Sequence, residues 1–251
     1  MKTNDRPLTD LMKAVDTGAA QLPDFQRGWV WDDGRIKALI LSVIHNFPVG
    51  AAMFLECGNE SIHFKHKPIE GSAAAPNTEP NELILDGQQR LTSLYNALYS
   101  KNPVHTKTDK GKEIDRYYYL NIEKALDASS DDEEIVISVP ATKQITSDFG
   151  RKIEIDLSTR TDEFSLKMFP LNIILNSAEE QGWQNEYYAY YNYDPAIIRQ
   201  FTELFSKIIM PTQKYAMPVI LLDKETPKEA VCQVFENVNT GGVSLTVFEL
   251  V

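Results

Sequence analysis

Hydrophobic residues recur every three or four positions in several stretches of the chain, and short apolar runs lie between these stretches. The first pattern is typical of a helix that buries one face, and the second is typical of a buried strand. The helical pattern predicts helices at 9–16, 33–47, 88–99, 177–191, 195–209, 227–238 and from Leu245 onward. The apolar runs predict strands at 51–56, 83–85, 116–122, 135–139 and 215–222.

Three details refine this outline. Phe47 continues the apolar face of the helix that starts near Asp33, so we expect it to be buried. Pro218 cannot donate a backbone hydrogen bond, so we expect the strand at 215–222 to lie near the edge of its sheet. The segment 65–82 contains three prolines and few apolar residues, which indicates an inserted loop.

The composition is that of an ordinary folded domain. The 251 residues are 43% hydrophobic and 24% charged, which is enough for a substantial core. Every apolar run is shorter than a bilayer span, and the N-terminus has no apolar signal segment, so we expect a soluble, cytoplasmic protein without membrane contact. The two cysteines, Cys57 and Cys232, are too few for a disulfide framework, and we expect buried free thiols.

The net charge of −11 argues against a general nucleic-acid clamp, because phosphate contacts drive non-specific binding. The acidic run at 127–134 is most simply a solvated loop. If the protein meets DNA, we expect a confined local site or a further domain to make the contact.

The most informative stretch is 83–94, where a short apolar run breaks and continues as a helix. Asp86 can cap that helix, with Gln89 completing a capping box, and Gly87 allows a tight turn. A helix start favours an anion through its N–H groups and its dipole. Three further polar side chains lie in this first turn, those of Gln88, Gln89 and Arg90. The stretch is either a well-capped surface helix or a phosphate pocket.

Two other polar clusters have similar alternatives. Arg27, beside Gln26, could grip phosphate with its planar guanidinium, or it could stack on a neighbouring tryptophan. The stretch 237–242 could be a helix C-cap, or its asparagines, threonine and paired glycines could hold an anion or a base. Cys57, His63 and His66 lie in one short loop without a fourth ligand, so we predict no metal ligand set.

In this order, the three clusters resemble a known family. The likeness is carried by FQR and the following tryptophans at 25–31, by LDGQQRLT at 85–92 and by VFENVNTGG with Leu245 at 234–245. The chain resembles the N-terminal domain of GmrSD-type modification-dependent restriction endonucleases from about residue 8 to its end. The resemblance implies an α+β fold, namely a ParB/sulfiredoxin-like small mixed sheet with surrounding helices and a helical C-terminal part.

The resemblance also gives an expected domain plan. A core at 1–160 would carry insertions near 65–82 and 101–160, a helical segment would follow at 161–214, and a return strand and helices at 215–251 would complete the core. The last predicted helix has only begun at Val251, so we expect a piece of a longer protein that ends before any nuclease domain.

The resemblance implies that this domain binds and hydrolyses a nucleoside triphosphate, GTP or ATP, with Mg²⁺. It would act in a phage-defence system against modified DNA, together with an HNH-type nuclease domain or subunit. The expected catalytic residues are Asp86, Gln88, Gln89, Arg90 and Arg27. The expected nucleotide-binding residues are Gln26, Gly87, Asn237, Asn239, Thr240, Gly241 and Gly242.

In the mechanism that we expect, Arg27 and Arg90 neutralise phosphate oxygens, and Gln88 or Gln89 orients the attacking water. Asp86 either caps the helix or holds Mg²⁺. Arg27, Arg90 and Asn239 should then converge on one ligand. Two alternatives stay open: a module that senses nucleotide or recognises DNA without turnover and regulates a partner nuclease, and a ParB-like domain that itself nicks DNA.

Overall fold

The computed structural model describes residues 2–58, 64–75 and 77–238, which belong to two compact units. Unit 1 contains Met1–Trp29, Val49–Thr92 and Ala216–Val251. Unit 2 contains Val30–Pro48 and Ser93–Tyr215. Unit 2 therefore combines the predicted insertion near 101–160 with the predicted helical segment at 161–214.

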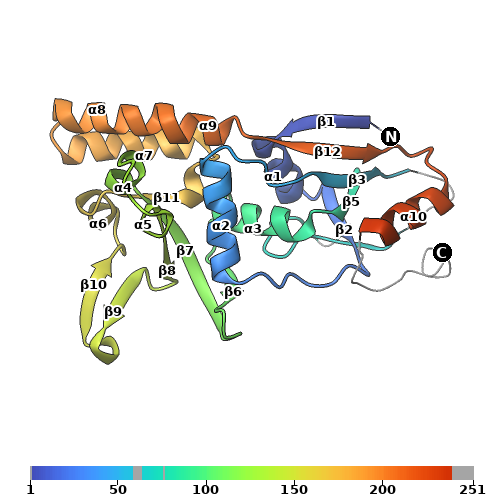
Figure 1. The fold of residues 1–251 in the computed structure, drawn as a ribbon, viewed down its shortest axis with the longest axis horizontal. Coiled ribbons are helices and arrows are strands. Elements are labelled where there is room, and N and C mark those ends of the chain that lie inside the picture. Colours follow the sequence, from blue (N-terminus) through green and yellow to red (C-terminus); the bar gives the residue numbers. More distant parts are fainter. Residues whose placement is uncertain (1, 59–63, 76, 239–251) are drawn as a thin grey trace. The chain divides into compact units, whose positions relative to one another are not determined.

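One six-stranded mixed sheet forms the centre of unit 1, in the order β1-β12-β3-β5-β2-β4 (Figure 1). Its strands are β1 (Lys2–Pro7), β2 (Ala20–Pro23), β3 (Ala52–Glu56), β4 (His66–Lys67), β5 (Glu82–Asp86) and β12 (Ala216–Leu222). The pairs β12–β3 and β5–β2 are parallel, and the other neighbours are antiparallel. The helices of this unit are α1 (Leu8–Asp16), α10 (Lys228–Val238) and the start of α3 (Gln88–Leu98), which continues into unit 2.

The strand at 215–222 lies near the edge of its sheet, as predicted, but it is not the edge strand, because β12 lies between the edge strand β1 and β3. The polar strand β1, which the hydrophobic pattern does not reveal, pairs along β12 and places Asp5 opposite Pro218. The ladder between β12 and β3 begins only at Val219. Pro218 therefore lies just outside that ladder, where its missing N–H costs no hydrogen bond to β3.

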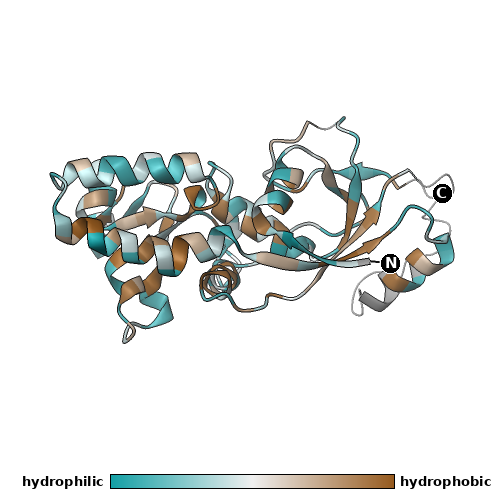
Figure 2. Ribbon diagram, turned by 90° about the horizontal axis from the view of Figure 1, so that it is seen from above, coloured by the Kyte–Doolittle hydropathy of each residue, from teal (hydrophilic) through white to brown (hydrophobic). Residues whose placement is uncertain are grey.

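The core of unit 1 joins its strands to α10. Its buried cluster consists of Leu55, Leu85, Leu222 and Val231, with Phe25, Met53, Phe64 and Val234 packed against it. The central strands β3, β5 and β12 are accordingly hydrophobic along much of their length, and Figure 2 shows hydrophobic stretches in the strands. The segment 65–82 is largely irregular, as predicted, but it packs on the sheet, since Ile69 is buried and Gln21 donates to Thr78 O at 2.6 Å.

Unit 2 is built around the long strand β7 (Glu113–Asn121), which pairs antiparallel with three other strands. These are β6 (Val104–Lys107), β8 (Val136–Pro140) and β11 (Met168–Pro170). A separate hairpin consists of β9 (Gln144–Ser147) and β10 (Lys152–Asp156). It lies in a part of the chain where the hydrophobic pattern predicts neither a helix nor a strand. The helices are α2 (Asp33–Ile44), α4 (Ile122–Leu126), α5 (Asp132–Ile135), α6 (Arg160–Ser165), α7 (Ser177–Tyr190), α8 (Pro195–Leu204), the π-helical η3 (Phe205–Ile209) and α9 (Met210–Gln213), with short 3-10 turns η1 (Asp148–Gly150) and η2 (Leu171–Ile173).

The predicted burial of Phe47 is wrong. Helix α2 ends at Ile44, and Asn46 then adopts a left-handed backbone with φ +57°. This turn takes the chain off the buried face of the helix, so the Phe47 side chain is 59% exposed while its carbonyl accepts a bond from Tyr215.

The predicted α+β class is confirmed, since the described residues form both mixed and antiparallel sheets with helices around them. The assignment to the ParB/sulfiredoxin-like fold stays a prediction. Among the described residues, the helices are all too short or too polar to cross a membrane.

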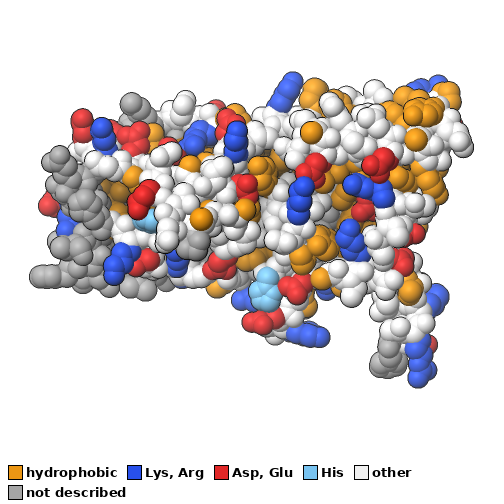
Figure 3. All heavy atoms as spheres, turned by 180° about the vertical axis from the view of Figure 1, so that it is seen from behind, with side chains coloured by type: hydrophobic (Ala, Val, Ile, Leu, Met, Phe, Trp, Pro, Cys, Tyr) orange, Lys and Arg blue, Asp and Glu red, His pale blue; other side chains and the backbone are white. Residues whose placement is uncertain are grey.

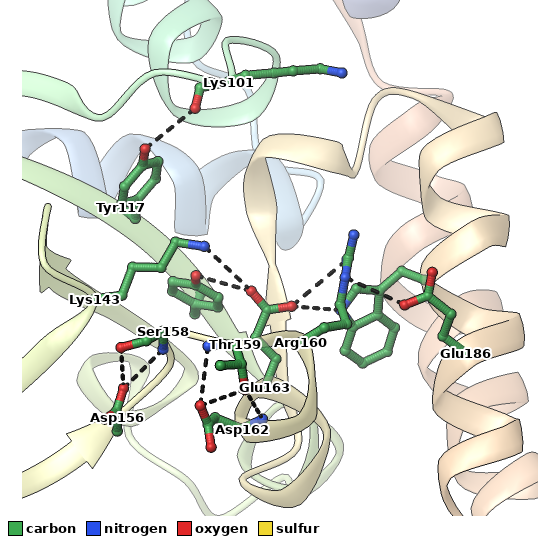
Figure 4. Close-up of polar contacts among 12 residues, drawn as sticks. Lys101, Tyr117, Lys143, Asp156, Ser158, Thr159, Arg160, Asp162, Glu163 and Glu186 are labelled. Carbon is green, nitrogen blue, oxygen red and sulfur yellow. Dashed lines mark hydrogen bonds and ion pairs between the residues drawn. The ribbon is translucent and has the colours of Figure 1, made fainter.

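A buried carboxylate connects three elements of unit 2. Glu163 of α6 accepts hydrogen bonds from the Tyr119 hydroxyl of β7 at 3.2 Å and from Trp183 Nε1 of α7 at 3.0 Å. Lys143 and Arg160 each lie 3.7 Å from its oxygens, and Figure 4 shows the carboxylate between these two cations. The two cations and the two hydrogen bonds lower the pKa of Glu163, but burial has the larger effect and raises the pKa above its ordinary value.

This shift predicts a specific pH dependence. A carboxyl group with a raised pKa in the folded state holds its proton more tightly there than in the unfolded chain. Its contribution to the free energy of unfolding is therefore lost as pH rises from its ordinary pKa of 4.5 through the folded-state value. Glu163→Gln should keep the bond from Trp183 but remove this titration.

Chemical unfolding at a series of pH values checks the prediction. The free energy of unfolding of the wild type, relative to Glu163→Gln, should fall as pH rises above about 4.5. If this difference in the free energy of unfolding stays constant or rises with pH, burial is not the largest influence on the pKa of Glu163.

Candidate functional site

The candidate site lies where β5 ends and α3 begins. Gly87 separates the two elements with φ +92°, a left-handed backbone that favours glycine. A side chain at this position would also come within 3.1 Å of Ala52 Cβ in the neighbouring strand β3. The predicted tight turn is therefore confirmed, and the group that approaches Gly87 closely is β3.

Asp86 is one residue too early to be the predicted cap of α3. It is the last residue of β5, and Gly87 occupies the position before the first helical residue, Gln88. The Asp86 carboxylate instead accepts from Arg90 Nη2 at 3.3 Å, one helical turn further on. Its side chain is 41% exposed, so an oxygen of this carboxylate is accessible to solvent.

Arg90 holds the chain that enters β3. Its Nη1 donates to Val49 O at 2.6 Å, and its Nη2 donates to Ala51 O at 2.8 Å. Gly50, between these carbonyls, has φ +86°, and a side chain there would collide with Arg90 Nη1. Both terminal nitrogens of the guanidinium therefore contact backbone oxygens within unit 1.

Three glutamine side chains hold the segment 26–29, which we call the arginine loop. Gln88 Nε2 donates to Arg27 O at 2.7 Å, and Gln89 Nε2 donates to Gly28 O at 3.2 Å. From the loop itself, Gln26 Nε2 donates to the carbonyls of β5 at 2.7 Å and 3.0 Å. The loop is thus fixed both to β5 and to the first turn of α3.

Two residues that the sequence motifs do not include hold the same loop from another segment. Lys67 Nζ of β4 donates to Gln26 O at 2.6 Å. The Glu70 carboxylate accepts from the backbone N–H of Trp29 at 3.0 Å. The segment 65–82 contains other charged residues as well, and the sequence contains nothing that links Lys67 and Glu70 to Gln26 or Trp29.

These bonds bring two of the three predicted clusters together. The Arg27 backbone is bonded to the first helical residue of α3, and its side chain is exposed. An exposed guanidinium on a loop fixed to a helix start is a suitable arrangement for binding an anion.

The third cluster follows a helix that packs on the same region. Val231 and Val234 of α10 belong to the apolar cluster that contains Leu85 and Phe25. Asn237 lies in the last turn of this helix, although its side chain is outside the described residues. The remaining predicted contacts, Asn239, Thr240, Gly241 and Gly242, lie outside the described residues altogether.

Within the described ranges, no three histidine, cysteine or acidic side chains are grouped so that they could hold an ion. His66 Nδ1 is 2.9 Å from Gln21 Oε1, and burial raises the pKa of the Cys57 thiol to about 11. Among the described residues at the start of α3, Asp86 offers an accessible carboxylate, which is a ligand type that Mg²⁺ accepts.

Comparison with known proteins supports the resemblance seen in the motifs. The family model for the N-terminal domain of GmrSD restriction endonucleases matches residues 8–251. An uncharacterized protein of Methanocaldococcus jannaschii, MJ0686, is 28% identical over 254 residues. That match covers 97% of this chain and 40% of the archaeal protein, so the chain spans about two fifths of its relative's length.

The contact between Gly50 and Arg90 gives a prediction for stability. Gly50→Ala should strain the left-handed backbone by about 1 kcal/mol and, by displacing Arg90, should cost about 1–3 kcal/mol more. Gly111→Ala is the matched control, because Gly111 also has a left-handed backbone, with φ +80°, but no atom within 4 Å of the added carbon. Chemical unfolding followed by circular dichroism measures both variants.

A double variant tests whether Arg90 causes the additional loss of stability in Gly50→Ala. In an Arg90→Ala background, Gly50→Ala should cost no more than Gly111→Ala. If Gly50→Ala and Gly111→Ala cost the same in the wild-type background, the assigned packing of Gly50 against Arg90 is wrong.

Proposed function

The chain belongs to the family of GmrSD restriction endonuclease N-terminal domains, and we propose that unit 1 binds a nucleoside triphosphate, GTP or ATP, at the start of α3. The phosphates would lie against the N–H groups of the first turn, where the helix dipole favours negative charge. The nucleotide would act within a DNA restriction system, in which the other domains or subunits include a nuclease.

The observation that carries this proposal is the bond from Gln88 Nε2 to Arg27 O. It fixes the backbone of a residue with an exposed guanidinium beside the start of the helix, where the dipole already favours negative charge. A simple capped helix does not need an arginine loop fixed to its start. The presence of both features therefore favours a bound phosphate over a helix cap alone.

The contacts distinguish a residue that could bind the phosphates from residues that position the backbone around them. Arg27 is the residue that we assign to the phosphates, because its side chain is exposed. Arg90 donates from both terminal nitrogens to backbone carbonyls, so we assign it to holding the segment 49–51. For hydrolysis, Gln88 or Gln89 would orient the attacking water, and the bonds of both side chains to the arginine loop fix them beside the first turn.

We propose that Mg²⁺ arrives with the nucleotide. Asp86 offers one accessible carboxylate at the end of β5. Such a site is consistent with the usual binding of Mg²⁺ through one or two carboxylates and the phosphates of the substrate.

A nucleotide sensor without turnover is the second candidate. The side-chain nitrogens of Gln88, Gln89 and Arg90 donate to backbone carbonyls, so the motif fixes the segments around the start of α3. A fixed arrangement of this kind is sufficient for binding, and binding alone could regulate a partner HNH-type nuclease.

We propose that DNA is contacted through a confined site or another domain of the full protein. On the face shown in Figure 3, basic and acidic side chains of the described residues are interspersed. With a net charge of −11, this distribution does not resemble the continuous basic surface of a general DNA clamp.

Calorimetric titration with ATP, GTP, CTP and UTP in the presence of Mg²⁺ tests nucleotide binding. Arg27→Ala should weaken binding of the preferred nucleotide about tenfold or more, because it removes charge-assisted hydrogen bonds to phosphate. Arg199→Ala, which removes an exposed arginine of α8 in unit 2, is the control and should bind like the wild type. Phosphate release with and without modified DNA then distinguishes hydrolysis from sensing.

Two results would contradict the proposal. The first is a wild-type protein that binds none of the four nucleotides. The second is Arg27→Ala with wild-type affinity, which would place any bound nucleotide elsewhere.

A further inference from the structure

The arginine loop is held from two sides, and only one side belongs to the recognised motif. The glutamines of α3 donate to the carbonyls of Arg27 and Gly28, in the middle of the loop. Lys67 donates to Gln26 O at one end, and Glu70 accepts from Trp29 N at the other end. Three consecutive carbonyls and the following N–H thus have side-chain partners.

We propose that Lys67 and Glu70 are positioning residues that set the direction in which Arg27 faces the nucleotide. This inference rests on the proposed function of unit 1. It assigns a role to the segment 65–82, which looks like a variable insertion in the sequence.

The local structure explains why such partners are needed. Residues 27–29 belong to no helix or strand, so no regular ladder fixes their backbone. The side-chain hydrogen bonds then hold the loop, and each lost bond widens the range of positions open to Arg27. An ammonium or carboxylate group makes stronger hydrogen bonds than a neutral group, which suits Lys67 and Glu70 to this task.

The segment that carries these two residues is itself anchored to unit 1. His66 and Lys67 pair with β2 as strand β4, and Ile69 is buried with 2% exposure. The positions of Lys67 and Glu70 are therefore set by strand pairing and core packing.

Nucleotide titration of matched variants tests the inference. Lys67→Met removes the donor to Gln26 O and should weaken binding about tenfold, equivalent to about 1.4 kcal/mol. Lys65→Met is the control, because Lys65 is an exposed lysine in the same segment, and it should bind like the wild type. Glu70→Ala should also weaken binding, whereas Glu70→Gln keeps an acceptor for Trp29 N–H and should restore affinity.

A double-mutant cycle shows whether Lys67 acts through Arg27. In an Arg27→Ala background, Lys67→Met should change the affinity by less than about twofold, because the residue being positioned is absent. A tenfold loss that persists in that background would mean that Lys67 contacts the nucleotide itself, and it would overturn the inference.

The outcomes separate this inference from the proposed function. If the wild type binds nucleotide and Lys67→Met binds equally well, the positioning role is overturned while the proposed function stands. If the wild type binds no nucleotide, the proposed function fails, and the inference fails with it.

Discussion

Hydrogen bonds from side chains to backbone carbonyls are the interaction on which the candidate site depends. Residues 27–29 lie outside regular secondary structure. The backbone of such a loop has no strand or helix pairing of its own that could fix its position. Gln88 and Gln89 supply hydrogen bonds to it from a helix that is itself fixed by Arg90 to the segment entering β3. One helical turn therefore positions two separate segments of unit 1.

This arrangement explains the composition of the DGQQR motif. A helix cap alone requires neither a guanidinium nor two amides, but a turn that must hold two loops requires donors of different reach. The glutamines reach the arginine loop, and the longer arginine spans two carbonyls on either side of Gly50. Because these groups are engaged in the folded protein, the exposed Arg27 becomes the best candidate for direct contact with a ligand.

The sequence predicts local structure well and long-range partners poorly. The strand, glycine turn and helix at 82–98 follow from hydrophobic spacing and from the conformational freedom of glycine, and the structure confirms them. The bond between Gln88 and Arg27 joins residues 61 positions apart, and no local pattern encodes it. For the same reason, Lys67 and Glu70 could not be found, and the polar strand β1 that covers β12 gave no hydrophobic signal.

The most direct test of the central claim is an amide chemical-shift titration of isotopically labelled protein with GTP or ATP and Mg²⁺. If phosphates bind at the start of α3, the largest shifts should fall on the backbone N–H groups of Gly87, Gln88 and Gln89 and on those of the arginine loop. Shifts confined to other parts of the chain, with these amides unchanged, would contradict the claim.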